Sequence, residues 1–172
     1  MPVLILADNA PPPPTADKRL HALHAYWTAI RGGRRFPARA DFDPIDIPAL
    51  LPFVSLVEVR EGTPRFVYRV MGTRLAELLR RDATGQAVGT GVKPEELESV
   101  LSRYHRVADD GVAIYHRDRL QEEANDYTAI DRLMLPMGDR DDKVELILGI
   151  VVRAEKEISE RYPRAGARPH KA

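Results

Sequence analysis

The chain has 172 residues, in which 26 lysines and arginines balance 26 aspartates and glutamates. This length suits one domain with one core, and a neutral total charge gives no general attraction to nucleic acid or to an anionic membrane. The absence of cysteine excludes disulfides, thiolate metal sites and cysteine nucleophiles. The longest apolar run, residues 146–152, is too short to cross a bilayer, and residues 1–7 make a poor signal peptide, so we expect a cytoplasmic protein.

The first thirty residues predict an arm followed by a helix. Residues 1–15 include four consecutive prolines and are expected to form a disordered arm. Asp17 is a suitable cap for a helix over 16–31, which Gly32 and Gly33 end. The helix carries an apolar stripe with spacings of 4, 3, 4 and 3, made of Ala16, Leu20, Leu23, Trp27 and Ile30. We expect this stripe to form a homodimer interface with Trp27 as its anchor; the alternative is that it packs on the chain's own sheet.

Residues 32–52 predict an irregular lead-in to the first strand of the sheet. Prolines push the preceding residues out of the α region, so only short helical turns are expected, with Asp43 as a cap before Pro44. The apolar residues of the lead-in are free to point inward: Ile45, Ile47, Leu50 and Leu51. Three aspartates, Asp41, Asp43 and Asp46, lie close together, but the glycine and glutamate of a calcium loop are missing, which favours capping and turn roles.

The remainder predicts an α+β domain. Residues 53–59 and 65–72 read as a hairpin, residues 74–81 as a short helix, and residues 94–110 as a longer helix that starts at a proline and ends at Gly111. Three further strands are expected over 112–120, 127–136 and 143–153, and a charged tail over 154–172. The last strand is apolar on both of its alternating faces, which indicates that both are covered.

Three segments, residues 26–59, 65–85 and 132–152, resemble a family of small bacterial stand-alone PAS proteins. The resemblance implies a single PAS-like domain over 16–153: a five-stranded antiparallel sheet with helices on one face, flanked by the N-terminal helix. It also implies a sensing or protein-interaction module that can enclose a small-molecule pocket. The family offers no catalytic signature to carry across.

The alternating apolar positions predict a core or cavity between the longer helix and the sheet. A small apolar or aromatic ligand would be held there, with His116 in the pocket wall. The expected lining is Tyr68, Val70, Leu97, Leu101, Tyr104, Ile114, His116, Leu133, Leu135, Leu146 and Leu148.

Other chemistry competes with this interpretation. His105, at the edge of the apolar stripe of the longer helix, is the residue that would ligate a haem. His116 with Asp131 could perform acid–base work, although no nucleophile or oxyanion site is evident. The arginines around the paired glycines could bind an anion or stabilise a helix end: Arg31, Arg34, Arg35 and Arg39.

The sequence therefore predicts a non-catalytic sensory or regulatory module without metal or cofactor. Its partners would be a second copy of the chain, an unknown signalling protein and a small ligand, and neither nucleic acid nor membrane. A haem-binding sensor or a small enzyme that uses the same cavity is the alternative.

Overall fold

The protein, seen in a computed structural model, is built on one antiparallel sheet, and the structure describes residues 3–123, 126–139 and 142–154. The sheet has six strands in the order β1-β4-β5-β6-β2-β3, so the α+β class is confirmed with one strand more than expected. The strands are β1 (Val3–Leu6), β2 (Val54–Val59), β3 (Phe66–Met71), β4 (Ala113–Glu123), β5 (Asp126–Met137) and β6 (Leu146–Arg153).

The extra strand comes from the segment that was expected to be a disordered arm. Residues 3–6 pair antiparallel with β4, with Val3 opposite His116 and Leu6 opposite Ala113. The prolines that follow are ordered as well, because Pro12 is buried and His21 Nε2 lies 3.0 Å from Pro13 O. The expectation was wrong because the short apolar segment ahead of the prolines forms an edge strand, and because proline's fixed φ stiffens an extended connection.

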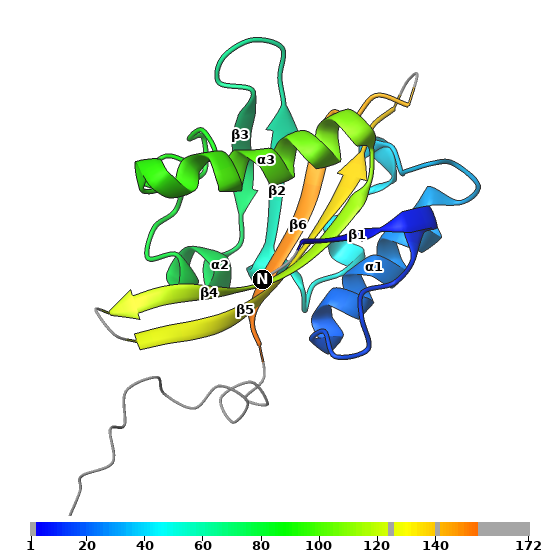
Figure 1. The fold of residues 1–172 in the computed structure, drawn as a ribbon. Helices are drawn as coiled ribbons and strands as arrows, with labels where there is room; N and C mark the ends of the chain where they lie inside the picture. Colours follow the sequence, from blue (N-terminus) through cyan, green and yellow to red (C-terminus); the bar gives the residue numbers. More distant parts are fainter. Residues whose placement is uncertain (1–2, 124–125, 140–141, 155–172) are drawn as a thin grey trace, which may run out of the picture.

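Three helices accompany the sheet: α1 (Lys18–Arg31), α2 (Thr73–Leu78) and α3 (Pro94–Asp110). The side chain of Asp17 accepts a hydrogen bond from Arg19 N at 2.9 Å, as expected of a helix cap. Gly111 ends α3 with φ of 62°, a left-handed conformation that glycine adopts without strain. α3 crosses the sheet face nearest the viewer in Figure 1, over the middle strands.

Directly opposite residues of antiparallel strands share a face, so the register sorts the sheet into two faces. α3 covers the inner face, where Phe66 lies with its ring centroid 5.6 Å from that of Tyr104. The inner face includes a row of paired residues from four strands: Ile114, Met134, Gly149 and Ser55. The outer face, which α1 covers in part, includes the neighbouring row: Tyr115, Leu133, Ile150 and Val54.

The stripe of α1 packs on the outer face of its own sheet. Leu20, Leu23 and Trp27 are fully buried within the single chain, and the indole N–H of Trp27 donates to Pro136 O at 2.9 Å. A second chain cannot reach these side chains, so their assignment to a dimer interface was wrong and the intramolecular alternative describes them. Ile30 is only partly buried. Because α1 and α3 lie on opposite faces, β6 is buried on both, as its apolar pattern predicted.

The lead-in between α1 and β2 contains three 3₁₀ turns, η2 (Arg39–Asp41), η3 (Pro44–Asp46) and η4 (Leu51–Phe53). The capping roles of the aspartates are confirmed at two positions. Asp43 Oδ1 accepts from Ile45 N at 2.9 Å, and Asp41 Oδ2 accepts from Ala38 N at 2.7 Å. Ile45, which was expected to point inward, is 81% exposed, whereas Ile47 and Leu50 are buried.

The fully buried position of Trp27 predicts a large effect of truncation. Trp27→Ala should lower the free energy of unfolding by about 3–5 kcal/mol, because the surrounding core cannot close the cavity that it leaves. Trp27→Phe loses mainly the indole hydrogen bond and should cost about 1–3 kcal/mol. Urea titration measures both, with the exposed Ile45→Ala as a control that should change stability by less than about 0.5 kcal/mol. A loss below about 1 kcal/mol for Trp27→Ala would contradict the packing of α1 on the sheet.

Candidate functional site

The two faces of the sheet divide the residues that were expected to line one pocket. Tyr68, Ile114 and His116 lie on the inner face, where Tyr104 of α3 meets them; the hydroxyl oxygens of Tyr68 and Tyr104 are 3.3 Å apart. The other strand residues lie on the outer face: Val70, Leu133, Leu135, Leu146 and Leu148. The prediction that these residues line one pocket was therefore wrong, because they lie on opposite faces of the sheet. Neighbouring positions of a strand point to opposite faces, so an error of one residue in the alternation moves every side chain of that strand to the other face.

Two α3 residues of the predicted lining, Leu97 and Leu101, are partly buried at the side of the helix. A Cβ on Gly89 would meet Leu97 Cδ1 at 2.4 Å, so both leucines pack towards the loop before α3. They also line an open groove of about 720 Å³ along the helix, together with Ser102 and His105. Leu101 also packs against the main hydrophobic core of the domain.

The inner face beneath α3 carries His116, which the sequence placed in a pocket wall, and two arginines that the sequence interpretation missed, Arg103 and Arg132. Arg103 of α3 is buried, and His116 of β4 is paired across the strands with Arg132 of β5. Burial, assisted by the charge of Arg103, lowers the pKa of His116 to about 4, so its imidazole is neutral at pH 7. No sequence pattern distinguished Arg103 and Arg132 from arginines on the protein surface, because an arginine side chain usually directs its charge to solvent.

His105 does not face this layer. Its side chain is about half exposed, its Nδ1 lies 2.8 Å from Arg65 Nη1, and its ring meets the edge of Phe66 with centroids 4.9 Å apart. An axial ligand of a haem held between α3 and the sheet would have to point inward. The position of His105 therefore gives no support to the haem alternative.

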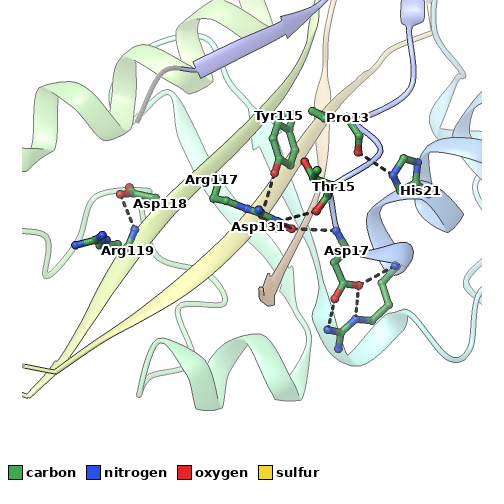
Figure 2. Close-up of polar contacts among 10 residues, drawn as sticks. Pro13, Thr15, Asp17, His21, Tyr115, Arg117, Asp118, Arg119 and Asp131 are labelled. Atoms are coloured by element: carbon green, nitrogen blue, oxygen red, sulfur yellow. Dashed lines mark hydrogen bonds and ion pairs between the residues drawn. The ribbon is translucent and has the colours of Figure 1, made fainter. Parts of the chain in front are cut away.

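Asp131 lies on the outer face, in the network drawn in Figure 2, and not beside His116. Its fully buried carboxylate accepts from Tyr115 Oη at 3.0 Å, from Arg117 Nη2 at 2.7 Å and from Asp17 N at 2.9 Å. The His116–Asp131 acid–base pair was thus wrong, since adjacent strand positions point to opposite faces. Burial and the Asp131 charge raise the pKa of Tyr115 to about 12, which keeps its hydroxyl protonated as a donor.

The four arginines of the lead-in do not converge on an anion site. Arg31 Nη1 donates to Arg34 O, and Arg34 donates to the carbonyls of Ile30 and Arg31 at the end of α1 and to Asp41. The bonds from Arg34 satisfy carbonyls at the C-terminus of α1. This is the helix-stabilising role that the sequence offered as the alternative to anion binding. Arg35 donates to Asp110 O at the end of α3.

The fourth of these arginines, Arg39, borders a cavity of about 340 Å³ on the part of the outer face that α1 leaves uncovered. We call it the outer cavity, and its lining is Arg39, Phe42, Pro44, Leu56, Arg69, Val70, Met137 and Leu146. A β-bulge between Leu56 and Val57 leaves Arg69 without a partner in the β2–β3 register, and Val70 is 47% exposed.

A family model described as "PAS domain" matches residues 16–152. The chain belongs to the PAS domain family. Solved structures show the fold relationship: a light-oxygen-voltage domain with a flavin analogue has 8% identity over 68% of this chain and 87% of that one, with a TM-score of 0.51. A LOV protein of Rhodobacter sphaeroides has 12% identity over 69% of this chain and 72% of that one, with a TM-score of 0.50.

An RNA-binding light-oxygen-voltage receptor is also similar, with 13% identity and a TM-score of 0.48 over 63% of this chain. The match spans about a third, 32%, of that longer protein. No curated protein matches the chain by sequence.

The PAS relationship assigns the chain to a family of sensory and signalling domains. Within the part of the PAS chain that the structure describes, no helix is long and apolar enough to span a membrane. The described residues also contain no cluster of three or more potential His or carboxylate metal ligands.

The Asp131 network of this PAS domain predicts strong coupling between its two charged members. Asp131→Asn should cost about 3–5 kcal/mol of unfolding free energy, because it leaves the Arg117 guanidinium without its counter-charge. The double variant Asp131→Leu/Arg117→Met should lose less than the sum of its single variants, since neither charge is then stranded. Denaturant titration of the four proteins measures this coupling, and strictly additive losses would contradict it.

The lowered pKa of His116 predicts a pH dependence of stability. Between pH 6.5 and about 4 the unfolded chain binds a proton that the folded His116 does not, so the unfolding free energy should fall as pH falls through this window. The loss from His116 should be about 1–3 kcal/mol. His116→Gln should reduce the slope, as measured by urea titration from pH 7 to 4.

The contribution of His24 to the pH dependence of stability has to be measured separately, because burial lowers the pKa of His24 too. Its contribution has the same sign, so His24→Gln is the matched comparison. The pKa of Asp17 is lowered by its bond to Arg19, and that contribution is lost only below the ordinary carboxylate range. An unchanged slope in His116→Gln would contradict the neutral, buried state of His116.

Proposed function

We propose that this PAS domain is a non-catalytic regulatory module that signals through protein contact, made by the uncovered part of its outer face. The observation that carries the proposal is the outer cavity with its exposed apolar border. Val70 is 47% exposed on β3, and Ile45, which follows Pro44 of the cavity wall in the chain, is 81% exposed. Exposed apolar residues around a hollow of this kind are typical of interaction surfaces.

The partner that we propose for this surface is a second copy of the chain. A two-fold contact would place the same apolar patch of two chains face to face, and each would cover Val70 of the other. Such a dimer differs from the α1 dimer that the sequence suggested, because the stripe of α1 is already buried within the chain. The alternative partner for this surface is an unknown signalling protein, and the Val70→Glu experiment below distinguishes the two.

The absence of a catalytic arrangement among the described residues supports a regulatory role. Asp131, the most deeply buried carboxylate, is saturated by Tyr115, Arg117 and Asp17 N and has no access to a substrate. His116 lies under α3 with its nearest carboxylate oxygen, from Asp118, at 4.0 Å. Neither group has the hydrogen-bonded base or the nucleophile that catalysis needs.

We also propose that the module binds a small molecule between α3 and the inner face. An absorbance spectrum of the purified protein, followed by mass spectrometry after denaturation, tests this directly. A Soret band would favour the haem alternative, and a colourless metabolite would favour the module proposed here. A flavin spectrum would instead relate this chain in cofactor, as well as in fold, to the light-oxygen-voltage domain with a flavin analogue.

Val70→Glu tests the contact surface. We expect light scattering to give twice the chain mass of 19.3 kDa for the wild type and the single-chain mass for Val70→Glu, because the substitution places a charge at an apolar contact. Tyr127→Glu is the matched control, since Tyr127 is 54% exposed on β5 and lies outside the cavity. A monomeric wild type that also captures no partner through Val70 would contradict the proposal.

A further inference from the structure

The first strand of the sheet is held mainly by its backbone. β1 is four residues long and pairs with β4 from Val3 opposite His116 to Leu6 opposite Ala113. Val3 and Leu4 are 40% and 46% exposed, and Leu6 is the residue of β1 that is buried in the core. A short edge strand with little buried side-chain surface leaves and rejoins its partner more readily than a central strand does.

The five residues that follow β1, residues 7–11, lie at the surface, and we call them the hinge. All of them are exposed except the half-buried Asn9. Asp8 and Asn9 have φ of 51° and 60°, in the left-handed region that residues with a side chain seldom adopt. β1 therefore reaches its place on its own chain through two consecutive residues in an unfavourable backbone conformation.

Beyond the hinge the chain is fixed to its own domain. Pro12 is buried, His21 Nε2 lies 3.0 Å from Pro13 O, and Arg117 donates to Thr15 O at 2.9 Å. Figure 2 shows the contacts of Pro13 and Thr15, which involve neither β1 nor the hinge. β1 can therefore detach together with the hinge while the segment that leads into α1 keeps its place.

A second copy of the chain offers the same strand in the same register. When two chains exchange β1, every contact between β1 and β4 is made again between the chains, so the two forms differ only in the hinge. Exchange allows Asp8 and Asn9 to become extended, the conformation that the following run of prolines favours. The effective concentration of a strand tethered to its own chain, on the order of millimolar, opposes exchange.

We propose that the β4 edge is an interaction surface for β1 of a second copy, so that two chains exchange their first strands and each completes the sheet of the other. The register specifies the contact, since Ile5 of one chain takes the place opposite Ile114 of the other. An extended hinge spans about 20 Å between Leu6 and Pro12, so the two β4 edges lie close together in the exchanged pair.

This contact goes beyond the outer-face dimer of the proposed function. β1 lies at one edge of the sheet, whereas β3, which carries Val70, lies at the opposite edge. The tethered strand is favoured below millimolar concentration, so the closed chain predominates at micromolar concentration. A chain mass measured at micromolar concentration therefore reports the outer-face contact and not the exchange.

The experiment introduces thiols into a chain that has no cysteine of its own. Opposite residues of antiparallel strands have Cα atoms about 4.5–5.5 Å apart, which suits a disulfide. The Ile5→Cys chain is mixed with the Ile114→Cys chain near millimolar concentration, warmed to open the hinge and then oxidised. We expect a covalent pair with twice the chain mass of 19.3 kDa, joined between positions 5 and 114 in a peptide map. Ile114 is 1% exposed, so a chain that merely touches the surface does not reach a thiol there.

Two controls accompany the mixture. The double variant Ile5→Cys/Ile114→Cys should form the same disulfide within one chain at micromolar concentration, which checks that both substitutions leave the strand pairing intact. Leu4→Cys mixed with Ile114→Cys is the matched control, because Leu4 pairs with Tyr115 and points to the other face, so no link to position 114 should form. The proposal is wrong if the double variant closes its disulfide but the mixture of single variants gives no link between chains.

Hinge variants test the exchange without any disulfide. Asn9→Gly removes the cost of the left-handed conformation and should lower the exchanged fraction, whereas the β-branched side chain in Asn9→Val disfavours that conformation and should raise it. The dimerisation constants of the two variants should differ by about tenfold or more. Light scattering near millimolar concentration measures them in a Val70→Glu background, where the outer-face contact is removed. Equal constants, or a single-chain mass for both variants, would contradict exchange and leave the outer-face proposal untouched.

Discussion

The buried carboxylate of Asp131 is the constraint on which the attachment of α1 and of the segment before it to the sheet depends. A fully buried charge is tolerated only when its acceptor positions are filled, and here β4 supplies Tyr115 and Arg117 while the start of α1 supplies Asp17 N. Arg117 also holds Thr15 O, so the segment before α1 is fixed by the same group. The position of α1 on the outer face is therefore held by these polar contacts as well as by the burial of Leu20, Leu23 and Trp27.

The sheet separates two kinds of chemistry because alternate residues of each strand face opposite sides. On β4, Tyr115 and Arg117 belong to a closed structural network, whereas His116 between them faces a layer of basic groups under α3. The strand thus places a basic inner-face side chain and the members of a closed outer-face network one residue apart in sequence.

Much of the fold was predictable from sequence because its signals are local. Asp17, Pro94 and Gly111 mark helix ends through capping and backbone conformation, and the apolar pattern of β6 indicated cover on both faces. The candidate site was predicted less well. β6 is apolar at nearly every position, so its pattern cannot say whether Leu148 or Ile147 faces α3; only the pairing register decides. Arg103 and Arg132 gave no signal, since burial of an arginine is a tertiary property.

The pairing of β1 with β4 means that the sequence family and the physical domain have different limits. The family model begins at residue 16, whereas the sheet begins at Val3, and Thr15 lies between the two as a hydrogen-bond partner of Arg117. A fragment cut at the family boundary would expose the edge of β4 along Ala113–His116 as unpaired backbone, open to strands of other molecules. Residues 3–6, which precede the segment matched by the family model, thus cover the edge of β4 and protect it from pairing with unrelated chains. A domain boundary taken from the family match alone would leave them out.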